Sequence, residues 1–532
     1  MNKKIKLFFV LSAASFLSLV ACNNNANKNT SSSVDPNVNP YIDLVEETNE
    51  AIIDDLKVVN AEGVYGNVRL PEDSNGASIS WWSSNPDIIN PHYEDDIAPG
   101  KVNRQENDEE VTLVAQIEKD GNKTKFEQKV TVKATPEAIE DDDYEAYLFG
   151  HFIGESYGEN KNGVKVATGE QMFFALADVG QGLHFKDMNG SSMSNLKPVL
   201  SSNVGERGVR DPFILRSPEG DTFYLIATDL SVYTRGGWGQ NNGENKFTIN
   251  GSRSITLWES HDLVNWTEAR LIEAAAPNAG MAWAPEMIYS EETGEYVIFF
   301  SSTIIEDKAI RERDCIYYTT TRDFVHFGET KKFIKNQPYP EGKEDPQKAQ
   351  DSPKAINNNE RKIIDASVMK IGDWYYSACK DGDNHEDGGI LIQKTQKLFD
   401  IDSWQKVLDL DDLGFKSPWS YRAPNGSTKT VLNNNCLEGP EWFVLNQSDR
   451  SGEDKTIPEY GLMADFYADT SKGYMPFATK NIEDADNSQN SWRQLKSGTD
   501  YSWDAQTKRH GTILRITADE AERLKEAYPF AA

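Results

Sequence analysis

The sequence predicts an all-β protein in which a small all-β module precedes a five-bladed β-propeller. Apolar and polar residues alternate with a period of two between residues 46 and 134. Between residues 144 and 532 a degenerate repeat recurs, in which an aromatic strand is followed by a short loop and a second aromatic position. Helix signals are sparse until residues Ala518 to Ala527, near the C-terminal end.

The composition narrows the classes of partner. The chain has 532 residues, a net charge of −30 and a hydrophobic fraction of 38%, which is enough for a sizeable core. Such acidity repels nucleic acid and anionic membrane surfaces, so we expect no nucleic-acid partner. Of the four cysteines, Cys315, Cys379 and Cys436 lack zinc-ligand spacing, and we interpret them as buried thiols, with one disulfide left open.

Residues 1–21 have the pattern of an export signal. A basic start is followed by the apolar run Leu7 to Val20, which is too short for a membrane span. The run ends in Leu-Val-Ala-Cys22, which resembles the bacterial lipobox. We expect a lipoprotein signal peptide, lipidation of Cys22, and an extracytoplasmic protein that meets the cell membrane only through this anchor. A plain secretory signal with a chance cysteine is the alternative.

A tether and a module follow the signal. Residues 22–45 are rich in Asn and Ser and predict a flexible tether. In residues 46–134, Val111, Leu113 and Ile117 alternate with polar residues before a hairpin turn at Asp120-Gly121. This pattern and Ser-Ser-Asn-Pro-Asp-Ile88 resemble bacterial immunoglobulin-like modules, which implies a β-sandwich that either binds polymer or only acts as a spacer.

An acidic linker leads into the long repeat region, residues 144–532. Inner strands of propeller blades converge on an axis, so residues far apart in the sequence meet there. An array of ordinary β-sandwiches is the alternative. The five copies begin at Phe173–Ala177, Phe223–Ala227, Ile316–Thr320, Ile390–Lys394 and Met475–Thr479.

Three carboxylates interrupt apolar strand patterns in this region. They are Asp211 in Val-Arg-Asp-Pro-Phe-Ile, Asp365 in Ile-Ile-Asp-Ala-Ser-Val, and Glu438 in Cys-Leu-Glu-Gly-Pro. A carboxylate inside an apolar strand costs several kcal/mol unless it is paired or functional. Asp211 taken alone also fits a turn next to Pro212, and Glu441 is a rival to Glu438. We predict that the three acids meet in one pocket.

Together with the five-fold repeat, these three acids make the chain resemble glycoside hydrolase family 43. The resemblance implies an extracellular inverting hydrolase with Asp211 as general base, Glu438 as general acid and Asp365 as the residue that tunes the pKa of the acid. It further implies release of terminal α-L-arabinofuranose from plant-type polysaccharides. The matching segments, in the order of the family, are Val209–Pro212, Ser260–Trp266, Trp283–Glu286, Ile364–Ser367, Glu438–Pro440 and Arg509–Gly511.

Other functions remain open at this point. A β-xylosidase and an endo-1,5-arabinanase of the same family fit the same motifs. A surface propeller that binds carbohydrate without catalysis would be expected to lack one of the three acids, and all three are present. An adhesin built on the N-terminal module would leave the carboxylates unexplained.

The remaining site predictions concern substrate binding and metal. We expect Arg210, Trp283, Glu286, Trp238 and His510 to surround one sugar ring. His510 resembles the axial histidine of the family, which implies a possible structural calcium ion at the propeller axis, although no cofactor is required for the reaction. We expect a monomer whose substrate is a plant cell-wall polysaccharide or oligosaccharide.

Overall fold

The computed structural model describes residues 38–156, 158–159, 165–190, 196–241, 246–307, 310–338, 354–355, 360–382, 389–413, 419–422, 427–431, 436–467, 473–484, 491–504 and 508–530. The predicted signal peptide, the lipidation site Cys22 and most of the tether lie outside these residues. Among the described residues, no helix has the length and apolar character needed to cross a membrane.

The N-terminal module is built on a five-stranded sheet with the order β1-β7-β6-β3-β2. The predicted hairpin turn joins β6 to β7, and Asp120 and Gly121 both have positive φ, as a tight hairpin requires. A separate two-stranded ribbon, β4–β5, comes between β3 and β6 in the sequence. The strands are β1 (Val45–Glu46), β2 (Asp73–Ser74), β3 (Ala77–Ser83), β4 (Ile89–Asn90), β5 (Lys101–Val102), β6 (Glu109–Lys119) and β7 (Asn122–Val132).

The module also contains a short helix, which the sequence analysis did not predict. Helix α1 (Glu50–Leu56) starts at Asn49, whose side chain accepts a hydrogen bond from the backbone N–H of Ala51. Ile52 and Leu56, one turn apart, are buried in the same core as Trp81. The four apolar residues of this seven-residue segment are too short a run to distinguish a helix from a strand in sequence.

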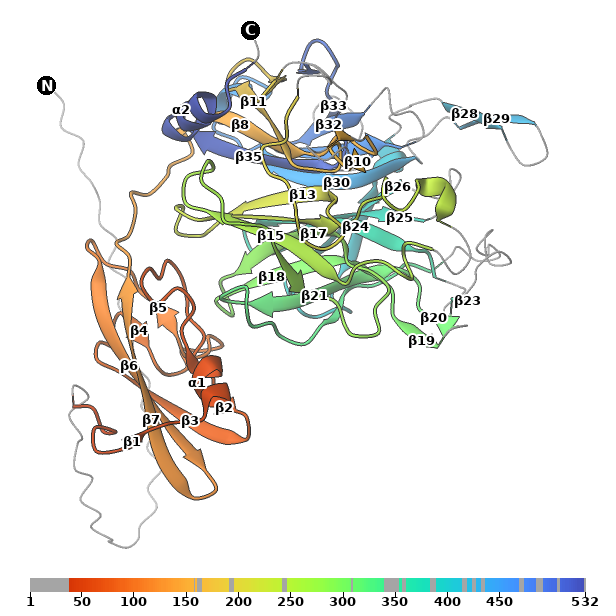
Figure 1. The fold of residues 1–532 in the computed structure, drawn as a ribbon. Helices are drawn as coiled ribbons and strands as arrows, with labels where there is room; N and C mark the ends of the chain where they lie inside the picture. Colours follow the sequence, from red (N-terminus) through yellow and green to blue (C-terminus); the bar gives the residue numbers. More distant parts are fainter. Residues whose placement is uncertain are drawn as a thin grey trace, which may run out of the picture.

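Five larger sheets follow in the described part of residues 144–530 (Figure 1). Four have four strands each, in chain order, and one has five strands in the order β34-β12-β11-β8-β35. Strand β35, near the C-terminal end, pairs with β8, the first strand of the region, so one sheet joins both ends of the region. Each of the five predicted repeat strands lies in a different sheet, as β11, β14, β21, β26 and β32.

The bounds of these strands are β8 (Tyr144–His151), β11 (Phe173–Asp178), β12 (Leu183–Asp187), β34 (Tyr501–Trp503) and β35 (Gly511–Thr517) in the five-stranded sheet; β13 (Val209–Arg216), β14 (Phe223–Asp229), β15 (Ser254–Ser260) and β16 (Arg270–Glu273); β17 (Trp283–Ser290), β18 (Glu295–Ser302), β21 (Cys315–Thr321) and β22 (Lys331–Ile334); β24 (Ile363–Ile371), β25 (Trp374–Asp381), β26 (Gly389–Thr395) and β27 (Gln405–Asp409); and β30 (Leu437–Val444), β31 (Tyr460–Phe466), β32 (Tyr474–Thr479) and β33 (Trp492–Gln494).

Smaller elements complete the fold. Helix α2 (Ala518–Ala527) coincides with the predicted C-terminal helix, and Thr517 caps it in a capping box with Glu520. Cys315, Cys379 and Cys436 are buried thiols outside any disulfide, as predicted. The other elements are β9 (Gly158–Glu159), β10 (Lys165–Val166), β19 (Ile305–Asp307), β20 (Ile310–Arg311), β23 (Lys354–Ala355), β28 (Trp419–Arg422), β29 (Thr428–Val431) and the short 3₁₀ helices η1 (Trp238–Gln240), η3 (Leu410–Leu413) and η4 (Gln447–Asp449).

The innermost strands of the five sheets form a ring. Strand β13 contacts β17, β17 contacts β24, β24 contacts β30, β30 contacts β35, and β35 contacts β13 again. Figure 1 shows these strands grouped in the middle of the larger domain. Segments far apart in the sequence therefore meet around one axis.

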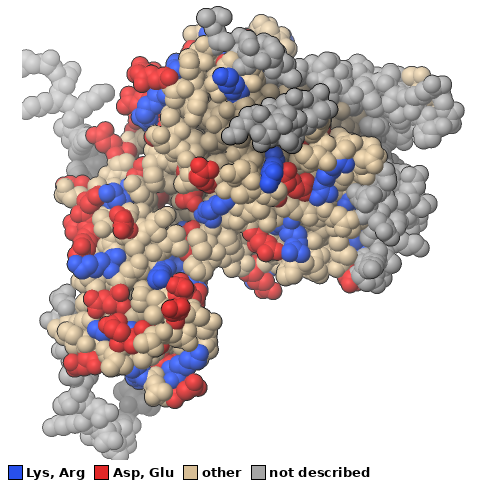
Figure 2. All heavy atoms as spheres, in the orientation of Figure 1, with Lys and Arg blue, Asp and Glu red and all other residues tan. Residues whose placement is uncertain are grey.

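The module is fastened to the sheets by two arginines. Arg104 forms two hydrogen bonds with Asp221, and Arg322 donates to the backbone carbonyls of Val68, Ala98 and Pro99. A cavity of about 470 Å³ lies beside this interface. On the face in Figure 2, Lys and Arg are interspersed with Asp and Glu over the described residues. This mixed surface offers no single electrostatic footprint for nucleic acid.

Candidate active site

Four of the five inner strands carry the same backbone irregularity. In β13, β17, β24 and β30 the pairing register shifts, and one residue at the shift has positive φ. These residues are Asp211 (φ 48°), Ala284 (44°), Asp365 (53°) and Gly439 (53°). Each shift is a β-bulge, which bends the strand and redirects a side chain.

The bulges explain how two of the predicted acids reach the axis. A non-glycine residue in the left-handed region costs on the order of 1–3 kcal/mol, and such residues cluster at functional sites. Asp211 and Asp365 hold this conformation in two sheets, whereas Ala284 and Gly439 hold it in the other two. Glu438 immediately precedes Gly439, the residue with positive φ in the β30 bulge, and its side chain lies at the same axis.

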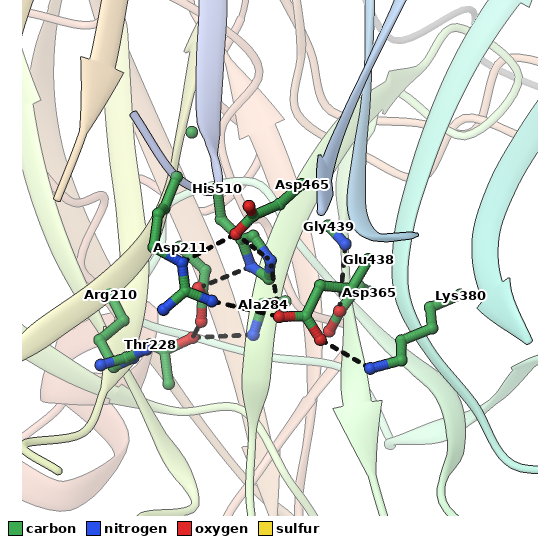
Figure 3. Close-up of polar contacts among 12 residues, drawn as sticks. Arg210, Asp211, Thr228, Ala284, Asp365, Lys380, Glu438, Gly439, Asp465 and His510 are labelled. Atoms are coloured by element: carbon green, nitrogen blue, oxygen red, sulfur yellow. Dashed lines mark hydrogen bonds and ion pairs between the residues drawn. The ribbon is translucent and has the colours of Figure 1, made fainter. Parts of the chain in front are cut away.

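Asp211 is held as an anion (Figure 3). Its Oδ1 lies 3.0 Å from Nδ1 of His510, and its Oδ2 accepts a hydrogen bond from Thr228 Oγ1 at 3.0 Å. The Thr228 oxygen itself accepts from the backbone N–H of Ala284 at 2.7 Å, which fixes its orientation. Burial opposes ionisation, but the hydrogen bond and positive charge of His510 outweigh it, so the pKa of Asp211 is lowered.

Glu438 is surrounded by three cationic side chains. Lys380 Nζ lies 2.6 Å from its Oε2, Arg509 donates to Oε1 at 3.2 Å, and His510 Nε2 lies 3.5 Å from Oε1. Burial raises the pKa of Glu438, but the charge of Lys380, followed by His510 and Arg509, holds it well below its ordinary value. In this ligand-free arrangement Glu438 is ionised.

Asp365 has the opposite electrostatic setting. Its Oδ2 accepts from the backbone N–H of Gly439 at 3.3 Å, and its own backbone N–H donates to Ser301 Oγ at 2.8 Å. Burial raises its pKa and outweighs the positive charge of His510, which lowers it, while the smaller effect of the negative charge of Glu438 adds to the rise. The structure therefore brings together all three predicted acids.

His510 lies between Asp211 and Glu438 (Figure 3). Burial disfavours its charged form, but its contacts with Asp211 and Glu438 prevail and raise its pKa to about 10. One ligand atom each from Asp365, Glu438 and His510 lies within 4.8 Å of the others, a spacing that suits a metal ion. Calcium, however, takes six to eight oxygen ligands. A protonated imidazole and the Lys380 ammonium on Glu438 do not fit it.

Arg210 lies beside the site rather than within it. Its guanidinium contacts Glu155 at 2.7 Å and Glu170 at 3.0 Å, and it lies over the ring of Phe152. Only 5% of the Arg210 side chain is exposed. Its charge lowers the pKa of Asp211 to a lesser extent than His510 does. A buried ion pair of this kind fixes the wall behind the general-base candidate.

The two predicted tryptophans lie together. Trp238 is 44% exposed, its ring meets Trp283 edge-on at 6.3 Å, and its Nε1 donates to Glu155 at 3.0 Å. The same Glu155 carboxylate pairs with Arg210, which connects the tryptophans to Asp211. An exposed indole next to the acids offers the apolar face that a sugar ring stacks on.

Glu286 and the rival acid Glu441 lie in the interior. Both are at most 8% exposed and border a cavity of about 20 Å³. Such a cavity holds about one water molecule and has no room for a sugar ring. Burial, followed by the charge of Glu441, raises the pKa of Glu286 well above its ordinary value, and burial raises the pKa of Glu441 to about 7. Asp211, Asp365 and His510 border the same cavity.

Sequence reasoning did not single out Lys380, Thr228 and Asp465. Asp465 is fully buried and accepts from Arg509 Nε at 2.8 Å, so it fixes the arginine that contacts Glu438. Lys380 follows the apolar stretch of β25, which is the same kind of interruption that identified Asp365. That signal was available in the sequence. The pairing of Lys380 with Glu438 on the inner strand β30 was not.

Two family models match the chain. One, described as a probable glycosyl hydrolase domain and related to glycoside hydrolase family 43, matches residues 142–522. The chain belongs to this family. The other, an atrophied bacterial immunoglobulin domain, matches residues 47–135. The family 43-related domain therefore contains all five larger sheets and the three acids, and the immunoglobulin-like module corresponds to the N-terminal sheet.

The family 43-related chain is similar to the following individual proteins. An alpha-L-arabinofuranosidase from Bifidobacterium longum subsp. longum is 32% identical over 473 residues, which cover 82% of this chain and 38% of the relative. The chain thus spans well under half the length of that protein. Among solved structures, a Penicillium chrysogenum alpha-L-arabinanase is 13% identical (70% of this chain, 85% of that chain, TM-score 0.35). A Lactobacillus brevis alpha-L-arabinofuranosidase is 14% identical (56% and 74%, TM-score 0.33).

Proposed function

We propose that this chain is an extracellular inverting glycoside hydrolase that releases terminal α-L-arabinofuranose from plant-type polysaccharides. The observation that carries the proposal is the placement of Asp211 and Glu438 on the two nitrogens of one imidazole, at 3.0 and 3.5 Å. From the imidazole between the two carboxylates we infer the wider separation of inverting enzymes, roughly 6.5–9.5 Å, rather than the ~5–5.5 Å of retaining enzymes. The wider gap leaves room for a water molecule on the far side of a sugar ring.

In this mechanism Asp211 is the general base. Its lowered pKa keeps it ionised, and the contacts with His510 and Thr228 fix the direction of its oxygens. The carboxylate removes a proton from water as the water oxygen attacks the anomeric carbon. The bond to the leaving oxygen breaks on the opposite face, so the anomeric configuration inverts.

Glu438 is the general acid, and it must carry a proton when the glycosidic oxygen leaves. Asp365, whose Oδ2 accepts a hydrogen bond from the backbone N–H of Gly439 next to Glu438, is the proposed modulator of the pKa of this acid. Trp238 and Trp283 provide stacking for a sugar ring, and Arg210 supports the wall of the site.

Further parts of the proposal concern the whole protein. We infer that the five sheets are the blades of a five-bladed β-propeller, because their inner strands contact one another in a closed ring. The immunoglobulin-like module, residues 46–134, is then a β-sandwich that spaces this domain from a lipid anchor at Cys22. The name of the Bifidobacterium relative favours arabinofuranose over the xylosidase and endo-arabinanase alternatives. We propose a monomer.

Initial rates test the proposal. Para-nitrophenyl α-L-arabinofuranoside, para-nitrophenyl β-D-xyloside and linear arabinan are assayed with wild type, Asp211→Ala and Glu438→Gln. Glu219→Gln, beyond the other end of β13, is the control because it removes a carboxylate outside the site. Turnover of the arabinoside that collapses only in the two site variants supports the proposal. Turnover of the xyloside alone, or of arabinan alone, would make the enzyme a β-xylosidase or an endo-arabinanase instead. If none of the three substrates is turned over, a hydrolase that acts on these sugars is refuted.

A further inference from the structure

A buried tyrosine hydroxyl joins the two segments that carry the acid and the histidine of the site. Tyr474 starts β32 and is 1% exposed. Its hydroxyl oxygen lies 2.6 Å from the backbone carbonyl oxygen of Gly439 and 3.2 Å from that of Gly511. Gly439 directly follows Glu438 in β30. Gly511 directly follows His510 and starts β35.

The shorter of the two contacts determines which carbonyl the hydroxyl serves. A phenol has one hydrogen to donate, and an O–H···O contact of 2.6 Å is a short, well-formed hydrogen bond, whereas 3.2 Å lies beyond the usual range. Burial holds the pKa of Tyr474 well above its ordinary value, so the hydroxyl keeps that hydrogen. The hydroxyl therefore donates mainly to Gly439, in the bulge next to Glu438.

The backbone of Gly439 is held from two directions. Its N–H donates to Oδ2 of Asp365 at 3.3 Å, and its carbonyl accepts from Tyr474. Gly439 lies at the register shift of β30, where the regular ladder of bonds between strands is interrupted. A buried carbonyl at such a point needs a partner outside the ladder, and the Tyr474 hydroxyl is that partner. The orientation of this peptide sets the direction in which the side chain of the preceding Glu438 points.

Tyr474 is itself fixed to the segment that carries His510. Its backbone N–H donates to the carbonyl of Lys508 at 2.9 Å, and its ring centroid lies 6.4 Å from that of the His510 ring. In the register of its own sheet Tyr474 pairs with Asp465, which pairs in turn with Glu438. The tyrosine therefore acts as a rigid spacer between the acid and the histidine.

We propose that Tyr474 is a positioning residue whose hydroxyl holds Glu438 at the distance and direction needed to protonate the leaving oxygen. This inference rests on the proposed function. Tyr474 neither gives nor takes a proton in the reaction. Through the peptide of Gly439 it sets where the Glu438 carboxyl lies. Without the hydroxyl the bulge relaxes and the acid moves away from the glycosidic oxygen, while the base Asp211 keeps its contact with His510 at 3.0 Å.

Two arabinosides that differ only in the leaving group test this role. The oxygen of para-nitrophenyl α-L-arabinofuranoside leaves with little help from an acid, whereas the more basic oxygen of phenyl α-L-arabinofuranoside needs protonation. Tyr474→Phe should lower kcat on the phenyl arabinoside by about 10- to 10²-fold with KM near its wild-type value, because a displaced acid acts only in the transition state. The loss on the para-nitrophenyl arabinoside should be clearly smaller. A variant that merely contains less folded enzyme would lose the same fraction on both.

The chain offers a matched control. Tyr147 on β8 is also fully buried, and its hydroxyl donates to Asp449 and accepts from the backbone N–H of Asn446. Tyr147→Phe removes the same group from the interior and should leave the rates on both arabinosides unchanged. Thermal unfolding of each variant reports whether it folds. If Tyr474→Phe does not fold, 4-fluorophenylalanine at that position fills the volume of the hydroxyl without donating, and it takes the place of phenylalanine in the comparison.

Each outcome decides one question. A loss that is concentrated on the phenyl arabinoside in Tyr474→Phe and absent in Tyr147→Phe supports the role of Tyr474. A folded Tyr474→Phe enzyme with equal losses on the two arabinosides, or with no loss, overturns that role and leaves the proposed function intact. Wild type that hydrolyses neither arabinoside overturns the proposed function, and the role of Tyr474 with it.

Discussion

Gly439 and His510 are packed so closely that no side chain fits between them. A Cβ atom on Gly439 would lie 2.6 Å from Cγ of the His510 ring, and Gly439 has a φ of +53° that L-residues rarely adopt. Gly439→Ala should therefore displace the imidazole that connects Asp211 and Glu438. We expect kcat to fall by about 10²-fold or more, because a misplaced acid–base pair forfeits the general acid–base contribution.

Gly372→Ala is the control for that substitution. Gly372 has a φ of +57° in the turn between β24 and β25, and a Cβ there would meet nothing within 4 Å. It shares the backbone strain with Gly439 but not the clash. Equal losses of activity in the two variants would mean that strain alone, and not the position of His510, explains the effect.

Asp365→Asn should shift the pH profile toward lower pH. In the proposed mechanism the negative charge of Asp365 repels the ionised form of Glu438, so removing that charge should let the acid lose its proton at lower pH. The alkaline limb of kcat/KM should move down, and activity at neutral pH should fall. Asp449→Asn, which removes an acid that bonds Tyr147 and Gly182, serves as control. A limb that does not move would assign Asp365 a purely structural role.

The sequence predicted the elements with strong periodicity and the acids that interrupt them. Asp211 and Asp365 stood out because a carboxylate inside an apolar strand needs a reason, and both lie at the axis. Helix α1 was missed because its seven residues show only two buried apolar positions. The C-terminal helix α2 matches the predicted residues Ala518–Ala527, and the structure shows a capping box at its start.

The electrostatics of the site were beyond sequence reasoning. Lys380 and Glu438 are 58 residues apart and meet only because β25 and β30 belong to neighbouring sheets. The bulges left a local trace, since Pro212, Pro285 and Pro440 each follow the positive-φ residue, and proline inside a sheet is confined to edges or bulges. A proline inside the apolar stretch of each of these three strands is a signal that could have located the axis from the sequence.

The buried acids Glu286 and Glu441 should make stability depend on pH. The folded-state pKa of Glu441 is raised to about 7 and that of Glu286 is raised well above its ordinary value. Above pH ~4.5 the unfolded chain releases these protons while the folded chain retains them, so stability falls as pH rises. The loss for Glu441 approaches ~3 kcal/mol by pH 8. Urea unfolding at pH 5 and pH 8 measures it.

Glu441→Gln should reduce that pH dependence, because glutamine keeps the shape and does not ionise. Its stability at pH 8 should approach or exceed that of wild type. Glu295→Gln, another buried acid with a raised pKa but outside the axial cavity, controls for general effects of removing a carboxyl group. A Glu441→Gln variant as pH-sensitive as wild type would show that other groups set the dependence.

Arg322 fastens the immunoglobulin-like module to the family 43-related domain. Its NH1 donates to the carbonyls of Val68, Ala98 and Pro99, and its NH2 donates to Thr293 in the β17–β18 turn. Arg322→Ala leaves these buried carbonyls without their donor, which lowers the stability of the interface by about 1–3 kcal/mol. The module should then separate more readily, and limited proteolysis should cut the linker at residues 135–143 faster. Lys331→Ala, at an exposed position at the start of β22, should not change the cleavage rate. Equal cleavage in wild type and Arg322→Ala would place the docking energy elsewhere, with Arg104 and Asp221 as the next pair to test.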